Sequence, residues 1–86
     1  MASYSIELTR TAEKQLRRVA KQARVRLVGA IQSLARAPRP RGARKLQGYD
    51  AAYRIRVGRY RVIYEVFDDR VVVIVLKVGH RKDIYG

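Results

Sequence analysis

The sequence has no cysteine, only one histidine and no long run of apolar residues. Without cysteine it can have no disulfide, no Cys-ligated zinc and no thiol nucleophile, and one histidine gives no basis for a His-rich metal site. Its longest aliphatic run has six residues, Val71 to Leu76, whereas a transmembrane helix needs about 20. The first ten residues lack the basic and apolar stretches of a secretory signal. We therefore expect a cytoplasmic protein with no cofactor, no metal and no membrane partner.

Acidic residues are also scarce, with seven Asp and Glu against twenty Lys and Arg, a net charge of +13. Sixteen of the basic residues but only two of the acidic ones lie between Arg10 and Arg61. Fifteen of the twenty are arginine, whose guanidinium pairs bidentately with phosphate. Nucleic acid is therefore the leading partner class. A solvated basic surface fits this charge density less well, and an acidic protein partner stays compatible with it.

The 86 residues are enough for one small domain, which we expect to span residues 1–86. Tyr4, Ile6 and Leu8 alternate with polar residues and predict a short strand. Either Thr9 or Thr11 can cap the helical segment that follows.

Residues 10–37 contain no proline and one glycine, and they are predicted to be helical. Their apolar stripe recurs at steps of three and four, through Leu16, Ala20, Ala23, Leu27, Ala30 or Ile31, and Leu34. The pattern fits one long helix or two. Because about 28 residues exceed a typical globular helix, we favour two helices with a break around residues 20–23.

The rest of the chain predicts a sheet. Two prolines and a glycine end the helical region at residues 37–42. Strands are then predicted at residues 53–57, 60–67 and 71–78, and the last of these is apolar on both faces. Short turns separate the three, so they should run antiparallel. The predicted class is α+β, a small antiparallel sheet in the order β-α-α-β-β-β with two helices packed on one face.

Three arginines are predicted to share the exposed face of this sheet. Period-two alternation places Arg54 and Arg56 on one face of their strand, and across the tight turn Arg61 can join them. Three guanidinium groups on a rigid sheet would hold a phosphate. The alternative is an ordinary solvated face on which Glu65 pairs with the arginines, and for these residues alone it is slightly favoured.

The C-terminal segment makes the functional interpretation stronger. His80, Arg81 and Tyr85 lie within six residues of one another. Imidazole titrates near neutral pH and can move a proton, guanidinium can offset charge on a phosphate, and a phenol ring can stack on a base or move a proton. Taken singly, His80 could be a surface residue and Tyr85 a packing anchor. Beside a face with three arginines, the group predicts a catalytic site.

Three segments resemble the RelE/ParE toxin superfamily, and its RelE-like branch in particular. They are Lys45–Gly48, Tyr53–Val66 and Val78–Tyr85, and the span from Lys45 to Tyr85 is about half of the sequence. The predicted order of helices and strands agrees with this family along the whole chain, although the helical region matches it only generically.

The resemblance implies a toxin of a type II toxin–antitoxin system that cleaves mRNA in the ribosomal A site. It implies a cognate acidic or amphipathic antitoxin, a free toxin that is monomeric, and an oligomeric complex with the antitoxin. The implied reaction is attack of the RNA 2′-hydroxyl on the adjacent phosphate, without a metal. By position, Arg54 and Arg56 match the family's basic pair, and Arg61, Arg81 and Tyr85 match its other site residues.

One departure from the family pattern concerns proton transfer. The familiar basic pair is two lysines, whereas this chain has arginines, which stay protonated and are poor general bases. Proton transfer then falls to His80 or Tyr85. Contacts to ribosomal and messenger RNA are expected from basic residues outside the catalytic group, namely Arg17, Arg18, Lys21, Arg24, Arg26, Arg44 and Lys45.

Two other functions fit parts of the pattern. A ParE-like toxin of the same fold would inhibit DNA gyrase and cleave nothing, but such toxins generally lack the Arg and Tyr residues near the C-terminus. A non-catalytic RNA-binding module would need only the charge and the α+β fold.

Overall fold

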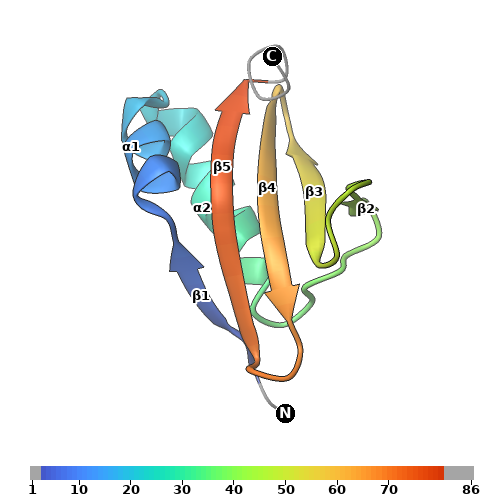
Figure 1. The fold of residues 1–86 in the computed structure, drawn as a ribbon. Helices are drawn as coiled ribbons and strands as arrows, with labels where there is room; N and C mark the ends of the chain where they lie inside the picture. Colours follow the sequence, from blue (N-terminus) through green and yellow to red (C-terminus); the bar gives the residue numbers. More distant parts are fainter. Residues whose placement is uncertain (1–2, 81–86) are drawn as a thin grey trace.

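The computed structural model describes residues 3–80, which form two helices and five strands. In chain order these are β1 (Ser5–Leu8), α1 (Arg10–Arg18), α2 (Lys21–Ser33), β2 (Arg44–Lys45), β3 (Ala52–Val57), β4 (Tyr60–Phe67) and β5 (Val72–His80) (Figure 1). The α+β class and the order of the predicted elements are confirmed. The two-residue strand β2 is an addition that the sequence pattern does not predict.

The five strands form one sheet in the order β1-β5-β4-β3-β2. Strands β3, β4 and β5 pair antiparallel, as the short turns between them predict. The sheet as a whole is mixed, because β1 runs parallel to β5 with Ser5 opposite Val72 and Leu8 opposite Val75. Short turns fix direction only between strands that follow each other along the chain. Strand β1 reaches its neighbour β5 after both helices and three other strands, so this argument does not apply to it.

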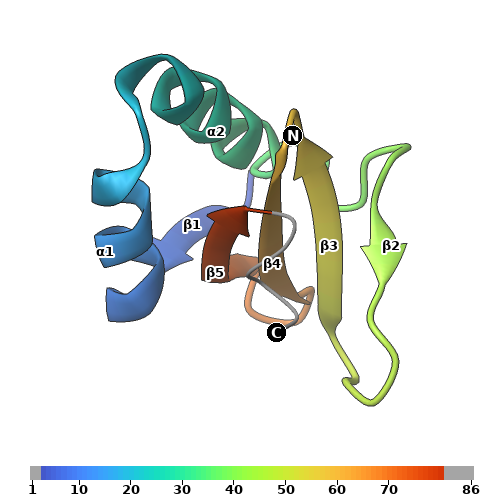
Figure 2. The same ribbon diagram turned by 90° about the horizontal axis from the view of Figure 1, so that it is seen from above.

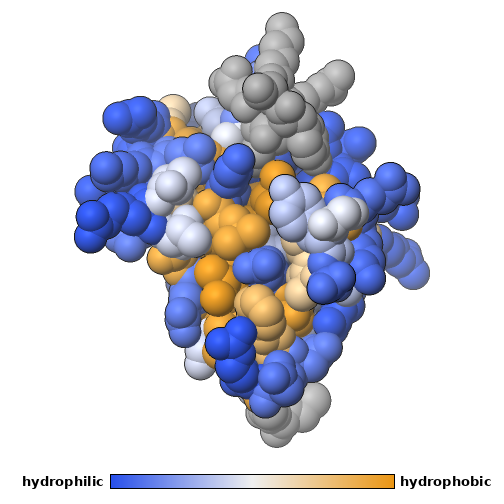
Figure 3. Space-filling model, in the orientation of Figure 1, coloured by the Kyte–Doolittle hydropathy of each residue, from blue (hydrophilic) through white to orange (hydrophobic). Residues whose placement is uncertain are grey.

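Helix α2 covers one face of the sheet, and α1 lies beside the edge of β5, as the view in Figure 2 shows. The core joins Ala12, Val19, Leu27, Ile31 and Leu34 of the helical layer to Ile55, Val62, Tyr64, Val66, Val73, Val75 and Val78 of the sheet. Within residues 3–80 no helix covers the other face, which we call the open face. Figure 3 shows an apolar band on the central strands of this face, bordered by hydrophilic residues. A one-sided helical layer therefore leaves half of the sheet surface exposed to partners.

The helical region breaks at Val19 and Ala20, at the start of the predicted interval. Both residues have extended backbone, with ψ of 143° and 146°. These extended residues shift the helical phase, so Val19 is buried and Ala20 is exposed. The expected place of Ala20 in the apolar stripe is therefore wrong, because the stripe was drawn across the break. Neither α1 nor α2 has the length and hydropathy that a span of a membrane would need.

Helix α1 closes the edge of β5 that β1 leaves uncovered. Its N-cap is Thr9, whose Oγ1 accepts from the Ala12 N–H at 3.0 Å and donates to the Leu76 carbonyl at 2.8 Å. One turn further on, Gln15 Oε1 accepts the Val78 N–H at 2.7 Å. These side chains satisfy backbone groups that would otherwise form an exposed strand edge. They also fix the last part of β5 against the helical layer.

Candidate nucleic-acid interface

The structure brings Arg54, Arg56 and Arg61 together on the open face. Arg56 is directly opposite Arg61 in the β3–β4 ladder, and Ile55 is opposite Val62. Opposed residues in an antiparallel pair share a face, and faces alternate along each strand. Because Ile55 and Val62 are buried under the helices, the three arginines project from the other side.

Two cross-strand pairs on this face join arginine to arginine. Besides Arg56 and Arg61, the register places Arg44 of β2 opposite Arg54. Like charges directly opposite each other repel across a sheet. A bound phosphate would offset the repulsion with charge-assisted hydrogen bonds. The two pairs lie side by side on the open face, where the sequence analysis expects Arg54, Arg56 and Arg61 to hold a phosphate.

His80 lies on the opposite side of the sheet from these arginines. Its Cα partner is Tyr60, and the two rings meet edge-on with centroids 5.8 Å apart. Tyr60 packs against the core, whereas the position opposite Arg61 is occupied by Gly79. The sequence analysis expected His80 beside the arginines. The structure instead places it on the other side of the sheet.

A β-bulge explains this difference. Ile63 pairs with Lys77 and Tyr64 pairs with Val75, so Leu76 is an extra residue in β5. An extra residue reverses the alternation of every side chain that follows it. Continued from the buried Val75 without a bulge, the pattern would place residue 80 on the open face.

The other predicted residues fall in three places. Lys45 is opposite Tyr53 in the register, and so faces away from Arg44. Arg81 and Tyr85 lie outside the described residues. The predicted helical contacts are all exposed near the break between α1 and α2, namely Arg17, Arg18, Lys21, Arg24 and Arg26. They form a second basic surface in the helical layer, separate from the open face.

Two of these helical arginines have partners within the chain. Arg17 Nη2 pairs with Glu13 at 3.5 Å, and both side chains are exposed. Arg24 Nη2 donates to the Val19 carbonyl at 3.2 Å. The exposed pair contributes little stability, so its side chains can reorganise toward another ligand at small cost.

The open face also carries an apolar hollow of about 440 Å³, which the sequence analysis did not predict. Its lining comes from β3, β4, β5 and the segment before β3, namely Leu46, Gln47, Tyr49, Ala52, Ile63, Leu76 and Lys77. Tyr49 is 59% exposed at this site. The signal in the sequence was the strand that is apolar on both faces, because only one of its faces meets the helices.

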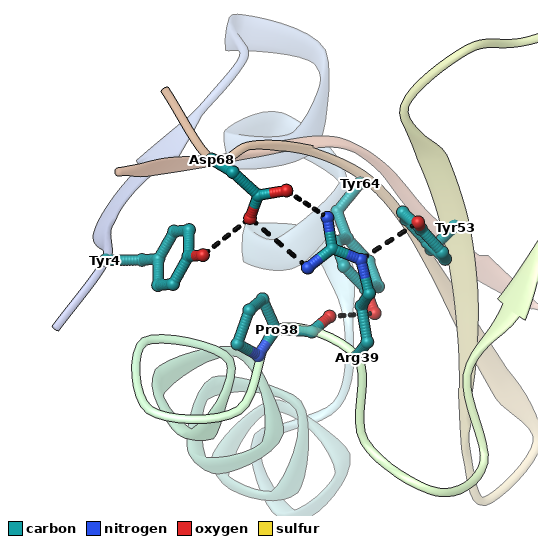
Figure 4. Close-up of polar contacts among 6 residues, drawn as sticks. All are labelled: Tyr4, Pro38, Arg39, Tyr53, Tyr64 and Asp68. Carbon is teal, nitrogen blue, oxygen red and sulfur yellow. Dashed lines mark hydrogen bonds and ion pairs between the residues drawn. The ribbon is translucent and has the colours of Figure 1, made fainter. Parts of the chain in front are cut away.

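A polar clamp at the other end of the sheet was also missed (Figure 4). Arg39 donates from Nη2 and Nη1 to the two carboxylate oxygens of Asp68, at 2.7 and 3.2 Å, and from Nε to the Tyr53 hydroxyl at 2.9 Å. Tyr4 donates its hydroxyl to Asp68 at 2.6 Å, and buried Tyr64 donates to the Pro38 carbonyl at 2.7 Å. The clamp connects the loop between α2 and β2 with strands β3 and β4 and with the turn that follows β4.

The clamp shifts the protonation of its members. Hydrogen bonds from Arg39 and Tyr4 lower the pKa of Asp68 below its usual value, because they stabilise the carboxylate. The hydrogen bond to Asp68 raises the pKa of Tyr4. Burial raises the pKa of Tyr64 to about 12. The carboxylate and both hydroxyls therefore keep their bonding forms at neutral pH.

Comparison with known proteins identifies the family of this fold and surface. The profile described as ParE toxin of type II toxin-antitoxin system, parDE, matches residues 6–85. The chain belongs to this toxin family. The mRNA interferase toxin RelE of Escherichia coli is 32% identical over 82 residues, 93% of this chain and 85% of its own.

Other toxins of the RelE/ParE superfamily match along nearly the whole chain. Toxin RelG of Mycobacterium tuberculosis is 30% identical over 83 residues, 95% of both chains. In the solved archaeal RelE–RelB complex from Pyrococcus horikoshii, one chain superposes with a TM-score of 0.83 at 30% identity, covering 94% of this chain and 98% of that one. The toxin fold and the order of its elements are therefore shared along the whole described chain.

Proposed function

We propose that this toxin is a ribosome-dependent endoribonuclease that cleaves mRNA. The observation that carries the proposal is the paired Arg56 and Arg61, with Arg54 beside them, on a face free of helices. Relatives that match along the chain are named RelE mRNA interferase, which supports the same activity. A solvated face would not need two like-charged pairs.

The proposed chemistry uses a nucleophile that belongs to the substrate. The 2′-oxygen of the RNA attacks the adjacent phosphorus, the bond to the 5′-oxygen breaks, and a 2′,3′-cyclic phosphate remains. The 2′-hydroxyl gives up a proton, and the leaving 5′-oxygen takes one up. Within residues 3–80 no three His, Asp or Glu side chains are grouped to hold a metal ion, and the step as written calls for none.

Each arginine has a proposed part in this step. Arg61 contacts the scissile phosphate, while Arg54 and Arg56 hold the flanking backbone and offset the charge that develops on the phosphorane. We assign Arg81 to the same phosphate. Because guanidinium stays protonated, none of these residues accepts the proton. With His80 on the other face, we assign proton transfer to Tyr85.

We further propose a cognate antitoxin that binds the open face. Solved complexes of this family contain RelB beside RelE. The apolar hollow next to the paired arginines fits an amphipathic segment whose apolar side chains fill the hollow and whose acidic side chains reach Arg54 and Arg56. Such a segment would cover the proposed RNA surface directly. An activity on translating ribosomes places the toxin in the cytoplasm.

The test is cleavage of mRNA on programmed ribosomes, read by primer extension. We expect cleavage within the A-site codon, and a loss of about 10²-fold or more for Arg61→Ala, the range of one electrostatic contact in a transition state. Arg70→Ala is the control, because Arg70 follows β4 at the end of the strand opposite to Arg61. Circular dichroism verifies that each variant is folded. A folded Arg61→Ala that cleaves like the wild type would refute the assignment.

The name of the matching family supports one other candidate, a gyrase inhibitor of the ParE type. A supercoiling assay with purified gyrase separates the two. The proposed function predicts ribosomal cleavage and unaffected supercoiling. Inhibition of gyrase without RNA cleavage would establish the alternative.

A further inference from the structure

The tip of the β3–β4 hairpin has a basic hollow on each of its sides. One hollow, of about 110 Å³, is lined by Arg56, Gly58, Tyr60 and Arg61. The other, of about 230 Å³, is lined by Ala23, Arg26, Val57, Gly58, Arg59 and Tyr60. Gly58 and Tyr60 line both, so the two hollows are neighbours across a single turn. Only the first contains residues of the arginine pair already described.

Arg26 of α2 lies close to the turn of this hairpin, where Gly58 is favoured by its backbone conformation. The φ of Gly58 is +61°, whereas Arg59 does not share the positive φ, which is typical of a two-residue hairpin turn with glycine first. A Cβ built on Gly58 would lie 3.6 Å from the Arg26 Nη1 atom. The Arg26 guanidinium therefore lies beside the hairpin tip, in the same hollow as Arg59.

Among residues 3–80, no ion pair joins an acidic side chain to Arg26, Arg56 or Arg59 at this tip. The two ion pairs of these described residues involve Arg17 and Arg39 instead. The sequence has no Asp or Glu between residues 14 and 49, nor between residues 51 and 64. All three of these arginines are exposed. Fixed like charges without acidic partners favour the binding of an anion.

We propose that Arg26 and Arg59 form a second phosphate subsite, on the helix side of the β3–β4 hairpin. A single RNA strand crosses the tip at Gly58, with one phosphate in the hollow of Arg56 and Arg61 and another in the hollow of Arg26 and Arg59. The absent side chain of Gly58 leaves room for the sugar–phosphate backbone to pass. The subsite thus extends the RNA path of the proposed function, on which it rests, from the open face to the helical layer.

The subsite can be tested without ribosomes or cleavage. The probe is a short single-stranded RNA with 2′-O-methyl groups, which cannot supply the attacking hydroxyl, and its affinity is measured between 50 and 200 mM salt. Each phosphate contact adds about 0.7 to the slope of log affinity against log salt for single strands. We expect Arg26→Ala and Arg59→Ala each to reduce the slope by about 0.7, and the double variant by about 1.4. Arg70→Ala removes the same charge at the far turn and should leave the slope within error.

Each outcome decides the proposal. The proposed subsite is refuted if the Arg26→Ala and Arg59→Ala variants have the same slope as the Arg70→Ala control. It is also refuted if the wild-type protein does not bind the RNA. A reduced slope that is seen with duplex RNA of the same length but not with the single strand would also refute the proposal, because the subsite would then bind a different RNA. If the two variants have lower slopes but the wild-type protein does not cleave mRNA on ribosomes, the subsite is supported and the proposed function is refuted. If the wild-type protein cleaves but the slopes of the variants are unchanged, the proposed function is supported and the subsite is refuted.

Discussion

The imidazole of His80 meets the ring of Tyr60 edge-on, with an interplanar angle of 76°, on the side of the sheet that Arg61 does not face. This relationship is the reason that we propose Tyr85 rather than His80 as the proton carrier. An imidazole on the helix side cannot reach a phosphate held on the open face while the strand is intact. His80 is better explained as a ring that packs at the end of β5.

We therefore expect His80→Gln to lower the single-turnover cleavage rate less than tenfold, because general acid–base groups usually contribute about 10²–10⁴-fold. The pH–rate profile of the variant should match that of the wild type between pH 5.5 and 9, with no limb lost in the range near 6.5 where imidazoles titrate. Tyr60→Phe, which keeps the edge-on ring, is the matched control. A loss of about 10²-fold together with a lost pH limb would return His80 to the chemistry.

Arg56→Gln should increase the stability of the free protein. The substitution relieves the repulsion between directly opposed guanidinium groups, and such cross-strand pairs change stability by about 0.2–1 kcal/mol. Urea unfolding should show the gain at low salt and a smaller gain at high salt, since salt screens the repulsion. The same variant should cleave poorly. Lower stability than the wild type at low salt would show that the pair is not repulsive.

Tyr64→Phe should destabilise the protein by about 1–2 kcal/mol, because it leaves the Pro38 carbonyl without its donor while the packing of the ring is kept. This difference in stability should decrease at alkaline pH. The pKa of Tyr64 is raised to about 12, whereas an unfolded tyrosine ionises near 10. This contribution is therefore complete below pH 10 and is lost as pH rises to 12. Urea unfolding from pH 8 to 12 should show the wild-type advantage shrinking, and an advantage that is constant over this range would contradict the assignment.

Asp68→Asn should lower the melting temperature near neutral pH, because the variant loses the ion pair with Arg39. Since the pKa of Asp68 is depressed in the folded state, the stabilisation is present above the usual carboxyl value of about 3.9 and disappears as pH falls below it. Thermal unfolding at pH 7 and at pH 2 tests this sign. Asp69→Asn, in the same turn, controls for the charge change alone. Equal shifts for both variants would mean that the clamp does not stabilise the fold.

The sequence predicted what local periodicity encodes. Alternation along residues 53–67 placed Arg54, Arg56 and Arg61 on one face, and the short turns set the direction of β3, β4 and β5. Both features depend on residues that are close in the chain. The cap of α1 also depends on nearby residues: the sequence offered Thr9 or Thr11, and the structure shows that it is Thr9.

The remaining features depend on tertiary contacts. The bulge at Leu76 has no local signature in an apolar strand, yet it decides the side on which His80 lies. The parallel pairing of β1 joins residues far apart in sequence. The bonds of Asp68 to Arg39 and Tyr4 join three segments that are far apart in the sequence, so only the folded structure shows them.

The parallel β1–β5 pair has a consequence for the timing of synthesis. Strand β1 is made first and β5 last among the described elements, and the core requires both. Contacts of such long sequence separation form late in folding, since the loop entropy must be offset before they contribute. While its own message is still being read, the growing chain therefore lacks a complete sheet. The hollow on the open face, which includes Leu76 and Lys77 of β5, is assembled only once β5 has emerged from the ribosome, so an antitoxin that fills this hollow binds after the sheet is complete.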